Sequence, residues 1–224
     1  MGIIAVTGAF GALGRSVVEL LADRGHVIAA IHLGEAPQSY PYGMAIGGID
    51  LTQPDAVAGA FAQIAKVHGR IDGLVNIAGG FMWRMVADTD PEDWDRMYRM
   101  NLLSAALCCR TATAYLSESG GSIVNIGAAA ARAPAAGMAP YAASKAAVMA
   151  LTESLANELK PHSRVNAILP TIIDTPANRA DMPDADGSEW VAPADLAKVV
   201  AFLLSPESAA ITGEGIKVSL GAKS

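Results

Sequence analysis

The sequence predicts an α/β fold in which a doubly wound parallel sheet carries helices on both faces. Short apolar runs rich in Ile and Val alternate with longer segments of helical periodicity, which is typical of parallel βαβ units. Such units are joined by right-handed crossovers. A length of 224 residues suits one domain, 1–224, and the hydrophobic fraction of 52% indicates a well-filled core.

The expected strands are short runs that are continuously apolar. In chain order they are 3–7, 26–32, 73–78, 121–127, 163–170 and 215–221. The expected helices, with apolar residues at helical spacing, are 12–25, 54–69, 91–117, 139–160 and 193–204. Pro54 suits a first helical turn, and Gly25 and Gly69 are expected to cap the C-terminal ends of their helices.

The stretch from Thr175 to Pro193 breaks this alternation. It is polar, rich in proline and long for a connection within a compact domain. Such loops are commonly lids or binding loops, and a mobile surface excursion is the alternative.

Composition and charge narrow the class of protein. The net charge of −6 argues against nucleic acid or an acidic membrane surface as a partner. The N-terminal apolar run is short and resembles a first strand rather than a signal peptide or an anchor. The adjacent residues Cys108 and Cys109 are expected to be core thiols of a cytoplasmic protein, and no metal-ligand spacing is present.

A glycine-rich turn follows the first expected strand, in the sequence TGAFGALG. Gly8, Gly11 and Gly14 suit a tight turn, a close backbone approach and close helix–strand packing, and the N–H groups of the following helix would face an anion. In this strand–turn–helix context the motif predicts a Rossmann-type site for a dinucleotide pyrophosphate. A purely structural turn is the alternative.

The end of the second strand bears on the choice between NAD and NADP. An acid there would accept hydrogen bonds from ribose hydroxyls, whereas a nearby arginine would accommodate a 2′-phosphate. His32 occupies this position, and no Arg or Lys occurs from Leu33 to Asp50. The sequence therefore favours NAD, with NADP possible, and His32 as a strand cap is the alternative.

Tyr141 and Lys145 are candidates for acid–base chemistry. Phenol titrates near pH 10, so an isolated tyrosine is a poor catalyst at neutral pH. The two residues are separated by four positions in a helical stretch and so share one face. We expect the lysine to lower the pKa of the tyrosine and to reach a ribose hydroxyl.

These motifs together resemble the short-chain dehydrogenase/reductase family over essentially the whole chain. The glycine turn, DGLVNIAGG, MNLLSAALCCR, GSIVNIG, YAASK, LPTIIDTP and ITGEGIKVSLG occur in the family's order. The resemblance implies Tyr141 as general acid/base, Lys145 as its partner on the nicotinamide ribose, and Asn101 as the anchor of a water in the proton relay. For Asn101, a helix kink or a bond to the backbone is the alternative.

The same resemblance implies a set of cofactor contacts. From the N-terminus these are Gly8, Phe10, Gly11, Ala12, Leu13, Gly14, His32, Asp50, Leu51, Asn76, Ala78, Gly79, Tyr141, Lys145, Pro170, Thr171, Ile173 and Thr175. Asp50 and Leu51 would meet the adenine, and the last four would hold the nicotinamide and its carboxamide. Family members are often dimers or tetramers, so a homotetramer is expected.

The chain departs from the family pattern at three positions. Ala12 stands where many members have a glycine, and Ile77 replaces a second asparagine. Ala128 replaces the serine that normally donates a hydrogen bond to the substrate carbonyl. Loss of such a donor can cost roughly 3–4 kcal/mol of barrier. Dihydropteridine reductases lack this serine, and the chain resembles that branch in GALG, in Phe81 after AGG and in the stretch from Leu169 to Trp190.

The leading hypothesis is therefore hydride transfer from a reduced nicotinamide to a quinonoid dihydropterin or similar conjugated ring. Phe81, Trp83 or Trp190 could stack on this substrate, with Phe81 and Trp190 as substrate contacts beside Ala128. Packing of these rings in a lid or in the core is the alternative. The second hypothesis is a carbonyl reductase or alcohol dehydrogenase acting on a small ketone or quinone. The third is a dinucleotide-binding protein without catalysis.

Overall fold

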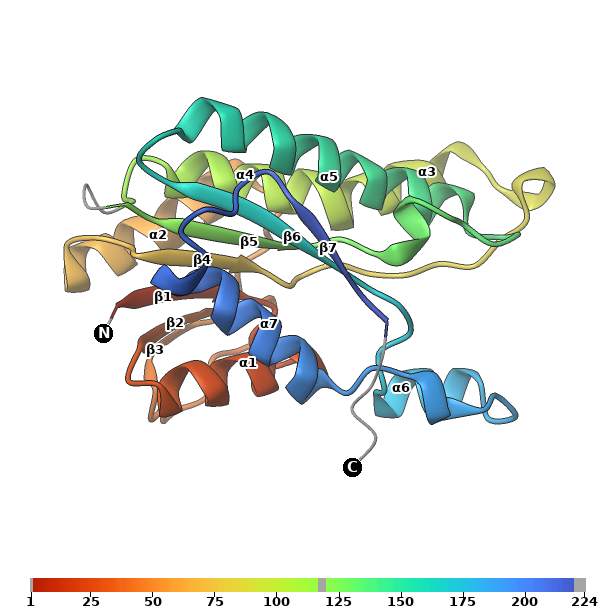
Figure 1. Ribbon diagram of the computed structural model, residues 1–224, viewed down its shortest axis with the longest axis horizontal. Helices are drawn as coiled ribbons and strands as arrows, with labels where there is room; N and C mark the ends of the chain where they lie inside the picture. Colours follow the sequence, from red (N-terminus) through yellow and green to blue (C-terminus); the bar gives the residue numbers. More distant parts are fainter. Residues whose placement is uncertain (1, 117–119, 220–224) are drawn as a thin grey trace.

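The computed structural model describes residues 2–116 and 120–219 and has one seven-stranded sheet (Figure 1). The strand order is β3-β2-β1-β4-β5-β6-β7, and every pairing is parallel. The strands are β1 (Ile3–Thr7), β2 (Val27–Ile31), β3 (Gly43–Ile46), β4 (Gly73–Asn76), β5 (Ser122–Ile126), β6 (Arg164–Pro170) and β7 (Gly215–Val218). The predicted single-domain α/β fold is confirmed.

Helices cover both faces of the sheet. They are α1 (Ala12–Asp23), α2 (Pro54–His68), α3 (Pro91–Met97), α4 (Ser104–Ala112), α5 (Ala139–Leu159), α6 (Pro176–Asp181) and α7 (Pro193–Leu204). Short turns are η1 (Val86–Asp88), η2 (Tyr98–Leu103), η3 (Ala129–Ala131), η4 (Gly187–Glu189) and η5 (Pro206–Ser208). Helices α1 and α7 pack on one face, while α2, α4 and α5 pack on the other (Figure 1).

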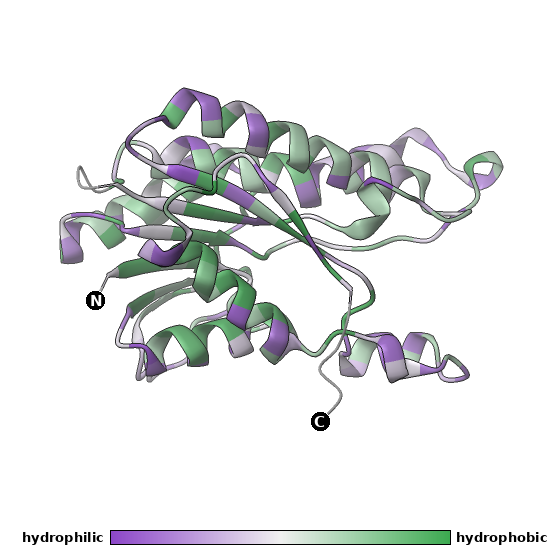
Figure 2. Cartoon of the chain, in the orientation of Figure 1, coloured by the Kyte–Doolittle hydropathy of each residue, from purple (hydrophilic) through white to green (hydrophobic). Residues whose placement is uncertain are grey.

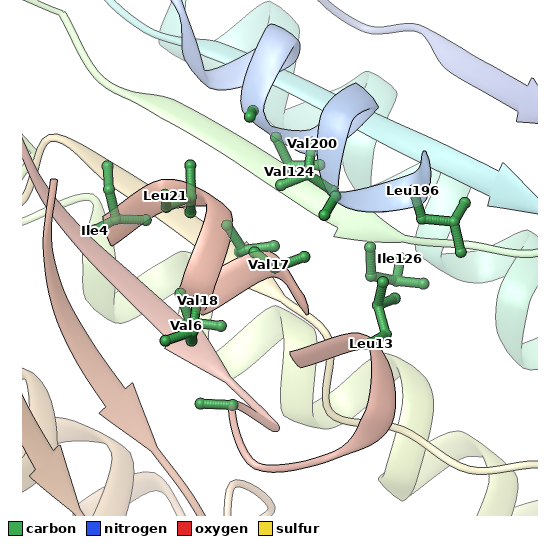
Figure 3. Close-up of a cluster of buried hydrophobic side chains, with 14 of the residues drawn as sticks. Ile4, Val6, Leu13, Val17, Val18, Leu21, Val124, Ile126, Leu196 and Val200 are labelled. Carbon is green, nitrogen blue, oxygen red and sulfur yellow. The ribbon is translucent and has the colours of Figure 1, made fainter. Parts of the chain in front are cut away.

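The core follows the two-residue period of the strands. Figure 3 shows Val6 and Val124 of the sheet packed with Val17 of α1 and Val200 of α7. The intervening strand residues join a second cluster under α2, α4 and α5. Green predominates along the central strands in Figure 2, as expected for a parallel sheet buried on both faces. Cys108 and Cys109 are free, fully buried thiols of the second cluster, as predicted.

Several boundaries differ from the sequence prediction. Strand β3 was not predicted, because it is a four-residue edge strand that, within residues 2–116 and 120–219, pairs with β2 alone. The expected helix 91–117 is divided by the π-helical turn η2, and α4 ends at Ala112. The expected loop from Thr175 to Pro193 contains α6 and η4. Residue 117 and the expected strand residues 220 and 221 lie outside the described residues.

The topology creates a binding edge between β1 and β4. From β1 the chain moves outward to β2 and β3, and it then returns to β4 on the other side of β1. Ligands of open parallel sheets bind at such a reversal, outside the carboxyl ends of the strands. Helix α6 lies beyond the carboxyl ends of β6 and β7 (Figure 1). Within the described residues, no helix has the length and apolarity needed to cross a bilayer.

Candidate functional site

A cavity of about 700 Å³ opens at the carboxyl ends of β1, β2 and β4. Many of its lining residues belong to the predicted cofactor set: Gly8, Gly11, Ala12, Leu13, Gly14, His32, Asp50, Leu51, Ala78, Gly79 and Thr175. The remaining members were not predicted as cofactor contacts: Ile31, Leu33, Ile49, Thr52, Ile77, Met100, Ser104, Pro176 and Ala177. The cavity thus brings together residues from the N-terminal half and from the α6 segment.

The glycine turn forms a cradle that side chains would fill. Gly8 has φ +64°, and a Cβ there would lie 2.9 Å from the backbone nitrogen of Ala78. A Cβ on Gly14 would lie 2.2 Å from the carbonyl oxygen of Gly8. Glycine is therefore required at both positions for the backbone to pack this closely.

Helix α1 presents free N–H groups to this cradle. Its N-cap is Gly11, which has no side-chain cap, and the first turn contains no acidic residue. In the described ranges, the N–H groups of Ala12, Leu13 and Gly14 find no acceptor, although all three residues line the cavity. Unpaired amides at the positive end of a twelve-residue helix suit an anion such as a pyrophosphate. The turn therefore fits a dinucleotide.

Asp50 also lines the cavity. Its Oδ1 accepts hydrogen bonds from the Thr52 N–H at 2.9 Å and from the Thr52 hydroxyl at 2.8 Å. These bonds, the backbone one first, lower the pKa of Asp50 from its usual value. A fixed, ionised acceptor is thus available to a donor group in the cavity.

A second cavity of about 430 Å³ shares His32 with the first and is lined by Phe10. The Phe10 ring packs edge-on against His32 at 5.1 Å and against Tyr40 at 5.8 Å. Arg15, Glu19 and Glu35 also line this cavity. The predicted contact Phe10 therefore faces the space beside the end of β2, away from the main cavity.

Tyr141 lies in the first turn of α5 and is partly buried. The Phe81 ring packs edge-on against it, with a centroid separation of 4.9 Å. Burial raises the pKa of Tyr141 to about 12, so the phenol is protonated at neutral pH. Phe81 is 53% exposed and covers one side of this phenol.

Lys145 lies one helical turn beyond Tyr141 and is 6% exposed. Its Nζ donates a 2.8 Å hydrogen bond to the carbonyl of Ile126, and it lies 3.4 Å from the position of a Cβ on Gly79. The ammonium therefore lies close to Gly79, which lines the main cavity. Burial lowers the pKa of Lys145 to about 8.

The expectation that Lys145 lowers the pKa of Tyr141 is wrong for this structure. Among the described residues, no hydrogen bond joins the two side chains, and the lysine donates to Ile126. Loss of hydration outweighs any attraction between phenolate and ammonium, so the pKa of Tyr141 rises. Sequence spacing indicates a shared helix face but gives no measure of desolvation.

Asn101 lies in the π-helical turn η2 and is 1% exposed. Its Oδ1 accepts from the Gly80 N–H at 2.9 Å, and its Nδ2 donates to the Gly80 carbonyl at 3.0 Å. Nδ2 also donates to the hydroxyl of Ser144 at 2.9 Å. The side chain thus takes the backbone-bonding role that was the alternative to anchoring a water.

Besides Phe10, six predicted cofactor contacts lie outside the lining of the main cavity: Tyr141, Lys145, Asn76, Pro170, Thr171 and Ile173. Asn76 is buried behind it, where Nδ2 donates to Asn125 Oδ1 at 2.9 Å. Pro170 ends β6 beside Val218. Thr171 has a buried hydroxyl that no described residue pairs with, and Ile173 forms an isolated bridge to Val191.

Two predicted substrate contacts are buried. Ala128 is 4% exposed, immediately before η3, which packs against α5. Trp190 is 8% exposed, with the Arg179 guanidinium 5.9 Å from its ring centroid. Packing within the α6 segment, the alternative to stacking on substrate, describes Trp190 in this structure.

Sequence reasoning also missed Thr7, which ends β1 before the glycine turn. Its hydroxyl oxygen accepts from the N–H groups of Ile77 at 3.1 Å and Ala78 at 3.2 Å. Thr7 therefore joins the turn to the end of β4. A hydroxyl at the end of an otherwise apolar strand was the available signal.

Comparison with known proteins gives the family. Residues 8–223 match the family profile described as Enoyl-(Acyl carrier protein) reductase. A 3-oxoacyl-[acyl-carrier-protein] reductase of Vibrio cholerae is 32% identical, over 96% of this chain and 95% of its own. The chain belongs to the short-chain dehydrogenase/reductase family. Members of this family are oxidoreductases, and the chain is therefore an enzyme of that class.

Other short-chain dehydrogenases/reductases are similar over the same extent. Carbonyl reductase family member 4 of Danio rerio is 33% identical, over 96% of this chain and 95% of its own. The ligand-free aldohexose dehydrogenase of Thermoplasma acidophilum superposes with a TM-score of 0.88 at 29% identity, over 97% of this chain and 92% of that one. A 3-ketoacyl-(acyl-carrier-protein) reductase from Brucella melitensis, solved with NADH, superposes with a TM-score of 0.85 at 26% identity, over 97% of this chain and 96% of that one.

Proposed function

We propose that this short-chain dehydrogenase/reductase uses NAD(H), with NADP(H) possible, to reduce a conjugated ring of the quinonoid dihydropterin type. The proposal rests on the partly buried phenol of Tyr141, whose pKa is raised by burial to about 12, and on Ala128, which supplies no hydroxyl just before η3, the turn that packs on α5. A proton donor is present, while the additional donor that would polarise a ketone is missing.

The residues around the main cavity support dinucleotide binding. Unpaired amides of Ala12, Leu13 and Gly14 would hold the pyrophosphate. The Asp50 carboxylate would accept from the adenine amino group, and Lys145 would meet the nicotinamide ribose beside Gly79. The relative from Brucella melitensis was solved with NADH. When bound, the reduced nicotinamide supplies the hydride.

The protein's own part in the reaction is delivery of a proton. A pKa near 12 keeps the proton on Tyr141 at neutral pH, which favours the reductive direction because the phenol then acts as an acid. Reduction of a quinonoid ring consumes one hydride and one proton, so the phenol balances the hydride. Solvent would return the proton to the phenolate.

The alanine at 128 selects among substrates. A ketone requires polarisation by hydrogen-bond donors, whereas a quinonoid ring is already electron-poor. The loss of one donor would therefore raise the barrier to ketone reduction by roughly 3–4 kcal/mol. The barrier to reduction of a quinonoid ring would rise less. Phe81, exposed next to Tyr141, offers a flat apolar surface for such a ring.

The comparisons favour a second candidate, a carbonyl reductase. Relatives from Vibrio cholerae and Danio rerio are named as a 3-oxoacyl-[acyl-carrier-protein] reductase and a carbonyl reductase. In this case another group would have to replace the missing hydroxyl.

Assembly as a homo-oligomer and a cytoplasmic location also stay proposals, to be tested by light scattering and by fractionation.

Steady-state kinetics with NADH separates the two candidates. We expect turnover of quinonoid dihydropterin, and a fall of two orders of magnitude or more in Tyr141→Phe, as for loss of a general acid. If the protein is a carbonyl reductase, Ala128→Ser should raise the turnover of ketones. If it reduces a pterin, Ala128→Ser should change the turnover of the pterin little. Wild-type pterin turnover no higher than that of Tyr141→Phe would exclude the leading proposal.

A further inference from the structure

Two buried hydroxyls on α5 make the same kind of contact and differ in what they connect. Ser144 accepts from Asn101 Nδ2 at 2.9 Å and donates to the Tyr141 carbonyl at 2.7 Å. Thr152 accepts from Asn125 Nδ2 at 2.9 Å and donates to the Val148 carbonyl at 2.8 Å. Only the first pair involves the turn of α5 that carries the phenol.

Hydrogen-bond direction fixes the orientation of the Asn101 amide. The Ser144 hydroxyl has one proton, which goes to the Tyr141 carbonyl, so it can only accept from Asn101. The amide nitrogen must therefore face α5, and Oδ1 must face the Gly80 N–H, 2.9 Å away. The Gly80 carbonyl accepts from the same Nδ2 at 3.0 Å, so Gly80 and Ser144 together hold the amide in this orientation.

This chain of bonds reaches the main cavity and the ring over the phenol. Asn101 Oδ1 lies 2.6 Å from the position of a Cβ on Gly79, which lines the cavity. Gly80 is followed directly by Phe81, whose ring packs on Tyr141. The Gly79–Phe81 segment and the first turn of α5 are thus tied through two side chains.

We propose that Ser144 is a positioning residue, which through Asn101 fixes the Tyr141 phenol relative to the cavity wall and the Phe81 ring. Ser144 and Asn101 are 6% and 1% exposed, so water does not replace the bond readily. The inference rests on the proposed function only for its effect on turnover, because the position of the phenol is measurable without a substrate.

The perturbation is Ser144→Ala, with Thr152→Val as the matched control. Each removes a buried hydroxyl from α5 that accepts from an asparagine and donates to the backbone. A misplacement of about 1 Å can cost on the order of 100-fold in rate, so we expect kcat to fall roughly 10-fold or more in Ser144→Ala. The Kd for NADH should change less than about twofold, because the glycine turn is untouched.

The second readout is independent of turnover. The chain has five tyrosines, and with 3-fluorotyrosine the ¹⁹F resonance of Tyr141 is identified by its loss in Tyr141→Phe. We expect that resonance to shift in Ser144→Ala, to stay in place in Thr152→Val and to return in Ser144→Thr, which keeps the hydroxyl.

The outcomes separate the two proposals. A shifted resonance and a lowered kcat in Ser144→Ala alone would support the positioning role. An unmoved resonance, or equal effects in Thr152→Val, would overturn it. If the resonance shifts in Ser144→Ala but the wild-type protein reduces none of the substrates, the positioning role is supported and the proposed function is excluded.

Discussion

Replacement of Lys145 by methionine should stabilise the fold while it removes activity. Burial lowers the pKa of Lys145 from 10.5 to about 8, and each pKa unit corresponds to about 1.4 kcal/mol. Holding a charged lysine in this site at neutral pH therefore costs about 3 kcal/mol. Methionine has a similar length and no charge.

The net gain is smaller, because Lys145 donates to the Ile126 carbonyl. Leaving that acceptor unpaired costs about 1 kcal/mol. We expect Lys145→Met to raise the free energy of unfolding at pH 7 by about 2 kcal/mol, and the Tm by about 4–8 °C for a chain of this size. Exposed Lys198, which pairs with Asp195, is the control, and Lys198→Met should change stability by less than about 1 kcal/mol.

The pH dependence of folding stability tests whether the buried lysine is destabilising. Between pH 8 and 10.5 the unfolded chain keeps the lysine proton and the folded chain has lost it, so stability rises with pH in this window. Tyr141 acts in the opposite sense above pH 10, because its pKa is raised to about 12 and the unfolded chain ionises first. Urea unfolding followed by circular dichroism at pH 7 and 9.5 measures the rise. Lower stability of Lys145→Met at pH 7, or an equal pH slope in wild type and variant, would refute this reasoning.

Further predictions concern the glycine turn and the second cavity. Gly14→Ala should destabilise the fold by several kcal/mol, because its Cβ would lie 2.2 Å from Gly8 O. The control Gly59→Ala, exposed within α2 with no atom near its Cβ, should stabilise it by about 0.5–1 kcal/mol in urea unfolding. In fluorescence titrations, Glu19→Gln combined with Glu35→Gln should lower the Kd for NADPH relative to the Kd for NADH by up to about tenfold. The two carboxylates line the same cavity as His32 and would repel a 2′-phosphate there. An unchanged ratio would mean that the 2′ position lies elsewhere.

Features that depend on local pattern could be predicted from the sequence. The central strands are continuously apolar, and the glycine turn is recognisable because its function requires missing side chains. Strand β3 carried no such signal, since Gly43–Ile46 is short and pairs along one edge only.

Features that depend on tertiary burial could not be predicted. The pKa of Lys145 follows from loss of water around its ammonium, which no spacing reveals. The bond between Asn101 and Ser144 joins residues 43 positions apart. Trp190 was expected at the substrate, yet Arg179 lies over its ring, because the polar stretch folds into α6 and η4.

Three features that ordinarily destabilise a protein fold lie close together at the carboxyl edge of this sheet. Helix α1 begins without a side-chain cap, the π-helical turn η2 interrupts a helix at Asn101, and Lys145 is buried with a lowered pKa. An uncapped helix is sufficient to bind a pyrophosphate. The buried lysine, which we propose meets the nicotinamide ribose, costs stability, and a protonated phenol on the same helix adds nothing to pyrophosphate binding. We therefore expect the phenol of Tyr141 to serve proton transfer, which a dinucleotide sensor without catalysis would not require.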